Sequence, residues 1–110
     1  MVEKGGGARR PGDRVPDLAC ALPDGGPTRL HAELGRRWAL LVPSSGGGAH
    51  LAEARKRLGE VVALTPEDGE RRDIWLVRPD AHLAWRGGPE AAPRLGRWLE
   101  GALRHGTARP

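Results

Sequence analysis

Three short, unbroken runs of hydrophobic side chains lie between residues 38 and 77 of this chain of 110 residues. The runs are Trp38–Val42, Val61–Leu64 and Ile74–Val77. An unbroken run of four or five apolar residues between polar loops is typical of a strand buried on both faces, as in the centre of an α/β sheet. We therefore predict that these three segments are the central strands of one sheet.

Two other segments repeat their apolar positions at helical spacing. Ala49–Leu58 is followed by Gly59, and Pro93–His105 is followed by Gly106, a residue that commonly ends a helix. The apolar positions are Leu51, Ala54 and Leu58 in the first segment, and Leu95, Trp98, Leu99, Ala102 and Leu103 in the second. The spacing predicts one helix between the first two strands and one that closes the chain.

The remaining polar and apolar positions predict shorter elements on either side of these. They are an extended segment Val15–Leu22, a turn Pro23–Gly26, a return strand Thr28–Leu30, a helical turn His31–Leu34, a polar loop Thr65–Arg72, a tight turn Arg78–Ala81 and an edge strand His82–Arg86. The order is hairpin, short helix, strand–helix–strand, hairpin and closing helix. It predicts a thioredoxin-like α/β fold with a central mixed sheet.

Gly and Pro at the two ends of the chain set the expected limits of the domain. Residues 1–12 include Gly5-Gly6-Gly7 and bury little apolar surface, so we predict a flexible N-terminal segment. Residues 13–106 are expected to form a single domain, and residues 107–110 a loose tail. The sequence holds no internal repeat.

Charge and composition exclude several classes of function. The net charge is +4, and the Arg residues are spread along the chain among Asp and Glu, whereas a nucleic-acid binder concentrates them on one face. No apolar run approaches the ~20 residues of a membrane span, and the N-terminus lacks the apolar core of a signal peptide. One cysteine builds no disulfide framework. We expect a bacterial, cytoplasmic protein that binds neither nucleic acid nor membrane.

Two motifs resemble known families. Gly12–Asp17, followed by a Pro-Asp-Gly turn, resembles the entry to the peroxiredoxin branch of the thioredoxin superfamily. Ile74–Arg86, with its Arg-Pro-Asp-x-His-x-Ala-Trp-Arg string, resembles a segment near the C-terminus of FAD-dependent aromatic hydroxylases of polyketide and antibiotic biosynthesis. The C-terminal domain of those hydroxylases is thioredoxin-like and lacks the redox cysteines. The resemblance implies that this chain is that accessory domain alone.

The resemblance also sets an expectation about the flavin. Gly5–Gly7 and Gly46–Gly48 do not fit the Gly-x-Gly-x-x-Gly pattern of a dinucleotide-binding strand–helix turn. We expect no cofactor on this chain, and FAD only through a partner flavoprotein.

The position of the reactive thiol in thioredoxin-like proteins is vacant in this sequence. That thiol sits after the first central strand, at a helix N-terminus that lowers its pKa. Ser44, Ser45, Gly46 and Gly47 occupy this stretch, and no proline stands near Asp73, where the cis-proline of such proteins would fall. We predict a redox-inactive domain. The two serines are expected to cap the helix; a nucleophilic or anion-binding role is the alternative.

Cys20 is the lone thiol, and its apolar neighbours favour a buried, inert side chain. The alternative is that Cys20 is exposed and that the chain is a peroxiredoxin-like, thiol-dependent oxidoreductase with a single cysteine. The histidines are His31, His50, His82 and His105; they have no metal-ligand spacing, so surface or strand-end positions and no metal site are expected. For His82 we expect a hydrogen bond that fixes the Arg78–Ala81 turn.

The Ile74–Arg86 motif supplies the candidate interaction surface. Its residues are Trp75, Arg78, Asp80, His82, Trp85 and Arg86. The two tryptophans are either core residues or an aromatic partner surface, and the arginines pair either with Asp80 or with a partner carboxylate. The leading interpretation is a non-catalytic docking or oligomerisation module for a FAD-dependent hydroxylase or for a second copy of itself. A small-molecule binding module is a further alternative.

Overall fold

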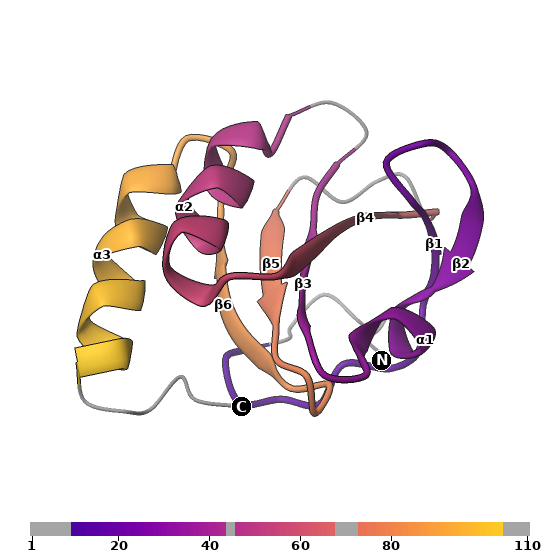
Figure 1. Cartoon of the computed structure of the whole chain (residues 1–110), viewed down its shortest axis with the longest axis horizontal. Coiled ribbons are helices and arrows are strands. Elements are labelled where there is room, and N and C mark those ends of the chain that lie inside the picture. The colour runs from indigo at the N-terminus through magenta and orange to yellow at the C-terminus, as the bar shows by residue number, and fades with distance from the viewer. Residues whose placement is uncertain (1–9, 44–45, 68–72, 105–110) are drawn as a thin grey trace, which may run out of the picture.

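A computed structural model describes residues 10–43, 46–67 and 73–104 and shows a six-stranded mixed sheet with helices on both faces (Figure 1). The strand order is β2-β1-β4-β3-β5-β6. The elements are β1 (Ala19–Ala21), β2 (Pro27–Arg29), α1 (Leu30–Leu34), β3 (Trp38–Leu41), α2 (Gly48–Leu58), β4 (Val61–Pro66), β5 (Ile74–Val77), β6 (Leu83–Gly87) and α3 (Ala92–Arg104). The predicted thioredoxin-like arrangement of elements is present.

The central strands are buried on both faces, as their unbroken apolar runs predict. β3 pairs in parallel with β4 through the α2 crossover and antiparallel with β5. Successive side chains of a strand point to opposite faces, so each run feeds two cores. Trp38, Leu40, Ile74 and Leu76 lie in one core, and Ala39, Leu41, Trp75 and Val77 lie in the other.

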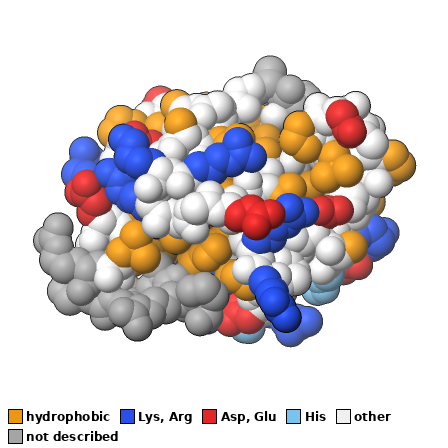
Figure 2. All heavy atoms as spheres, in the orientation of Figure 1, with side chains coloured by type: hydrophobic (Ala, Val, Ile, Leu, Met, Phe, Trp, Pro, Cys, Tyr) orange, Lys and Arg blue, Asp and Glu red, His pale blue; other side chains and the backbone are white. Residues whose placement is uncertain are grey.

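The helices α2 and α3 cover the first of these faces, side by side (Figure 1). Leu95 and Leu99 of α3 are fully buried in the core between these helices and the sheet, the helix-side core. Between the helices, the Arg57 guanidinium binds Glu53 at 2.7 Å and Glu100 at 2.9 Å. In the same orientation, Figure 2 shows Lys and Arg side chains over the side of the molecule where these helices lie.

The N-terminal part of the domain covers the opposite face. Val15, Leu30 and Leu34 are buried there. An Asp17 carboxylate oxygen accepts a hydrogen bond from the backbone N–H of His31, 2.9 Å away, at the start of α1. This hydrogen bond, together with the Arg29 guanidinium, lowers the pKa of Asp17. A side chain distant in sequence therefore satisfies a donor that the helix itself leaves open.

Several element boundaries differ from the predicted ones. The loop predicted from Thr65 is wrong at its start, since Thr65 and Pro66 extend β4 and pair with β1. Leu30 was expected to end a strand but begins α1. The last helix starts at Ala92, one residue before Pro93, which fits the first helical turn because its missing N–H is not needed there.

Part of the predicted flexible lead-in is held by hydrogen bonds. The Gly12 N–H donates to the Leu83 carbonyl at 2.7 Å, and the Leu83 N–H donates to the Asp13 carbonyl at 2.8 Å. Arg14 and His82 form an isolated β-bridge beside these. The segment at residues 10–15 thus runs along the outer side of β6 at its start. Residues 1–9, and residues 105–110 with the predicted tail and His105, lie outside the described part.

Candidate functional site

The turn between β3 and α2 is where the fold would place a reactive thiol. Gly47 is the N-cap residue of α2 and has a left-handed conformation with φ 91°; Gly46 also has a positive φ, 110°. The N-cap position therefore has no side chain, which corrects the expectation that a serine caps this helix. Ser44 and Ser45 themselves lie outside the described residues.

Gly47 packs so closely on Val42 that no side chain fits. A Cβ atom built at Gly47 would lie 2.5 Å from Val42 Cγ1 and 2.8 Å from Val42 Cβ. Both distances are well inside the ordinary contact separation of ~3.5–4.0 Å between carbon atoms. Val42 is itself a member of the helix-side core, at the end of β3. A cysteine at position 47 would meet steric overlap in addition to an unfavourable φ.

His50, in the first turn of α2, is the buried polar side chain of the helix-side core. Its side chain is 1% exposed, its Nε2 lies 3.2 Å from the Gly88 carbonyl, and its ring centroid is 5.9 Å from that of Trp85. Because a carbonyl only accepts, Nε2 carries the proton and donates. This corrects the expectation of a surface histidine. Position 50 lies four residues before the buried Ala54 and so on the same side of the helix, but a histidine gives no apolar signal there, so the sequence did not reveal its burial.

The stability of the domain is expected to fall as the pH drops below ~6.5, with His50 responsible. Burial lowers the pKa of His50 from its ordinary value of 6.5, with the Gly88 hydrogen bond and Glu90 acting in the opposite sense. Below pH 6.5 the imidazole of the unfolded chain therefore binds a proton, while the buried imidazole of the folded chain stays neutral down to a lower pH. The slope has an upper limit of about 1.4 kcal/mol per pH unit. Urea unfolding between pH 7.5 and 5 measures it.

The matched variants are His50→Gln and His82→Gln. The first should remove the slope below pH 6.5, while the second, at a more exposed ring, should keep it. An unchanged slope in His50→Gln would contradict this assignment.

The β5–β6 turn confirms the hydrogen bond expected of His82. Its Nδ1 lies 3.1 Å from the Asp80 carbonyl, and its backbone N–H donates to the Asp80 carboxylate at 3.3 Å. Arg78 binds the other carboxylate oxygen of Asp80 at 2.6 Å. Ala81 between them has φ 71°, which alanine rarely adopts, so these contacts hold a strained turn.

The two tryptophans of the candidate interaction surface are buried, so of the two interpretations left open by the sequence, the one that makes them core residues is confirmed. Trp75 is 3% exposed and Trp85 is 8% exposed, and they lie on opposite faces of the sheet. An exposed aromatic surface of both side chains is therefore a wrong reading of this motif. Arg86 pairs with Asp73 rather than with Asp80, and its guanidinium lies over the Trp75 ring, 5.6 Å from the centroid. What remains at the surface is the polar turn Arg78–Asp80–His82.

Cys20 is buried, as its apolar neighbours predict. Its side chain is 0% exposed and lies with Leu64 in the core on the face of the sheet opposite α2 and α3. Its Sγ lies 3.5 Å from the Leu18 carbonyl. In this position the thiol is closed to solvent. It also lies on β1, away from the β3–α2 turn.

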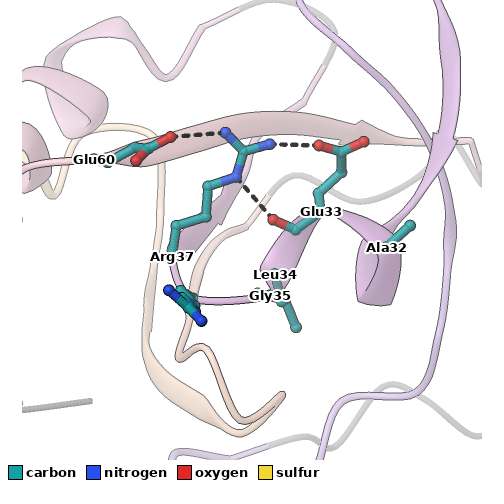
Figure 3. Close-up of a pocket in the computed structure, with 7 residues that line it drawn as sticks. Ala32, Glu33, Leu34, Gly35, Arg37 and Glu60 are labelled. Atoms are coloured by element: carbon teal, nitrogen blue, oxygen red, sulfur yellow. Dashed lines mark hydrogen bonds and ion pairs between the residues drawn. The ribbon is translucent and has the colours of Figure 1, made fainter.

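A hollow of about 350 Å³ opens beside α1 (Figure 3). It is lined by Ala32, Glu33, Leu34, Gly35, Arg36, Arg37 and Glu60. The Arg37 guanidinium binds Glu33 at 2.5 Å and Glu60 at 3.0 Å, and Glu33 also accepts the Thr28 hydroxyl at 2.6 Å. The Thr28 hydrogen bond and Arg37 lower the pKa of Glu33. These groups are engaged with one another, and their ion pairs link α1 to Glu60, the residue just before β4.

Metal and membrane features are equally limited in the described chain. No group of three His, Cys, Asp or Glu side chains in residues 10–43, 46–67 and 73–104 is placed to hold a metal ion. His31, for example, bonds the Val15 carbonyl through Nε2 at 2.9 Å. Within the same residues, every helix is too short or too polar to cross a bilayer.

The family of this thioredoxin-like domain follows from comparison with known proteins. The family model described as "Aromatic-ring hydroxylase, C-terminal" matches residues 8–110. The chain belongs to this family. No curated protein matches it by sequence. The resemblance carried by Ile74–Arg86 is therefore confirmed at the level of the family.

Solved structures of similar proteins include whole flavoenzymes. The chain is 29% identical to aklavinone-11 hydroxylase, which was solved with FAD and aklavinone, and the TM-score is 0.61. The match covers 87% of this chain and 21% of that protein. This chain is 32% identical to BexE, whose structure concerns oxidation during BE-7585A biosynthesis, with a TM-score of 0.53 and coverage of 78% and 19%. The chain thus spans about one-fifth of the length of these hydroxylases.

A peroxidoxin defines the fold independently. BcpB from Mycobacterium tuberculosis is 13% identical, with a TM-score of 0.59, and is covered over 98% of its length by 86% of this chain. At this identity the likeness shows the thioredoxin-like fold alone.

Proposed function

We propose that this chain is a redox-inactive, thioredoxin-like docking module that associates with the flavin-binding body of an aromatic hydroxylase. The observation that carries the proposal is the family match, joined to a helix N-cap position, Gly47, at which Val42 leaves no room for a thiol-bearing side chain. A thiol needs a polar, accessible site to become a reactive thiolate, and Cys20, the single thiol of the chain, is buried among apolar side chains.

FAD is then held by the partner and not by this chain. The Gly-rich stretch before α2 does not match the Gly-x-Gly-x-x-Gly pattern, and the hollow beside α1 is occupied by its own ion pairs. The chain's contribution is a rigid surface, and its effect on the reaction is exerted through the partner.

Binding to a flavoprotein is the direct test. The full chain is mixed with each FAD-dependent aromatic hydroxylase of its source organism, and complexes are detected by light scattering after gel filtration. A complex with the summed mass of the two proteins is expected at micromolar concentration. A flavoprotein of another class serves as the negative control. A chain that stays monomeric and binds none of the hydroxylases would contradict docking.

Cys20 should be protected from alkylation in the folded chain, which tests the alternative of a thiol enzyme. With the side chain fully buried, iodoacetamide should react about 100-fold or more slowly than in urea, because reaction requires an opening of the domain. In urea the rate should keep rising through pH 8 to 9, as for an unactivated thiol. Fast alkylation of the folded chain at pH 7 would favour the single-cysteine oxidoreductase instead.

A further inference from the structure

The two long helices carry the whole charge surplus of the chain. Gly48–Leu58 and Ala92–Arg104 together contain six Lys or Arg and two Glu, a surplus of four, which equals the net charge of +4. All other positions hold twelve basic and twelve acidic residues. These two helices are therefore cationic, while the charges at the remaining positions balance in number, and such an asymmetry favours the approach of an acidic partner to the side covered by α2 and α3.

The two acidic side chains of these helices are not paired with the exposed arginines of α3. Glu53 and Glu100 both bind Arg57 in the contact between α2 and α3. Arg94 and Arg97 are exposed on α3, and neither has an ion-pair partner among the described residues. A charge that finds no carboxylate within its own domain is available to one on another molecule.

Trp98 adds an apolar contact beside these two arginines. It is half-buried and packs against the helix-side core with part of its ring, so part remains at the surface. Positions 94 and 98 are four residues apart, and 94 and 97 three apart, so the three side chains share one side of the helix. Trp and Arg are the residues most enriched where protein interfaces hold their binding energy.

We infer that the outer face of α3, defined by Arg94, Arg97 and Trp98, docks on an acidic surface of the flavoprotein body. The inference rests on the proposed function and names the surface and the chemistry of its partner. A protein fits this face better than a nucleic acid does. Two exposed arginines are few for a run of phosphates, and the Trp98 ring is packed against the core rather than free to stack on bases.

Two double variants with the same change in charge test the surface. Arg94→Glu with Arg97→Glu reverses the α3 face, and Arg10→Glu with Arg36→Glu reverses two exposed arginines elsewhere. Each substitution removes two charges, so both variants lower the net charge from +4 to 0. All four positions are exposed, and circular dichroism with urea unfolding checks that both variants keep the stability of the parent chain.

The measurement is the affinity for the hydroxylase that forms a complex with the parent chain, at low and high salt. The α3 variant should bind about 10- to 100-fold more weakly and lose the salt dependence, while the control stays within about threefold of the parent. Equal binding by both variants would overturn the docking surface and leave the proposed function standing. If the parent chain binds no hydroxylase, both fail. Tighter binding of a short DNA duplex than of the hydroxylase would also overturn the inference.

Discussion

Gly47→Ala is expected to destabilise the domain by about 2–5 kcal/mol. Two costs add: an L-residue at φ 91° is disfavoured by about 1–2 kcal/mol, and overpacking against a core residue costs about 1–3 kcal/mol. The overlap falls on Val42 Cγ1 and Cβ, which are anchored in a β-branched side chain at the end of a central strand. The free energy of unfolding in urea measures the loss.

Gly25→Ala separates the two costs. Gly25 has nearly the same φ, 92°, but a Cβ there has nothing within 4 Å, so only the backbone cost should appear. Pairing Gly47→Ala with Val42→Ala should cost less than the sum of the single variants, because the smaller side chain relieves the overlap. Additive losses, or equal losses at the two glycines, would show that position 47 has room for a side chain and would weaken the redox-inactive assignment.

Trp85→Ala is expected to cost about 3–5 kcal/mol of stability, the range for a buried aromatic residue. Trp85 is 8% exposed, belongs to the helix-side core, and lies against the His50 ring and Gly87. Its loss leaves a cavity between β6 and the helices that these neighbours cannot fill. Trp85→Phe, which keeps part of the ring, should lose clearly less.

The same variant decides between a core and an interface role for this tryptophan. If the core assignment is right, Trp85→Ala weakens hydroxylase binding only to the extent that the chain unfolds, as thermal melts and binding on the same sample would show. A variant with the stability of the parent chain and no binding would instead return Trp85 to the interaction surface. The α3 double variant gives the opposite pattern, with binding lost and stability kept.

The long elements were predictable because they reflect local rules. Successive side chains of Trp38–Leu41 and Ile74–Val77 enter two different cores. A strand that is buried on both faces needs apolar residues at every position, so it is recognisable as an unbroken apolar run. The closing helix showed its buried stripe from Leu95 to Ala102 for the corresponding reason. Short elements were less predictable. Thr65 and Pro66 join β4 only because β1 lies beside them, and a pairing partner forty residues away leaves no local signal.

The candidate site was harder to predict than the fold. His82 bonding within its turn was accessible from sequence, since the donor and acceptor are two residues apart. The burial of His50 was not, because it depends on the β6–α3 connection packing over the first turn of α2. That Arg97 has no ion-pair partner among the described residues was hidden for a related reason: Glu100 follows it by three residues, a spacing at which the two could pair, yet Glu100 binds Arg57 of α2.

The amino-acid sequence by itself determined that one cysteine stands outside the thiol position, that the sheet has three twice-buried strands, and that the family motif lies in Ile74–Arg86. These properties depend on residue identity and short spacing. Only the tertiary structure decided that Trp85 and His50 face inward, that Val42 leaves no room for a side chain at Gly47, and that the two helices with the charge surplus cover the same face of the sheet. Those depend on which distant segments meet, and contacts of that kind are fixed by packing rather than by local pattern.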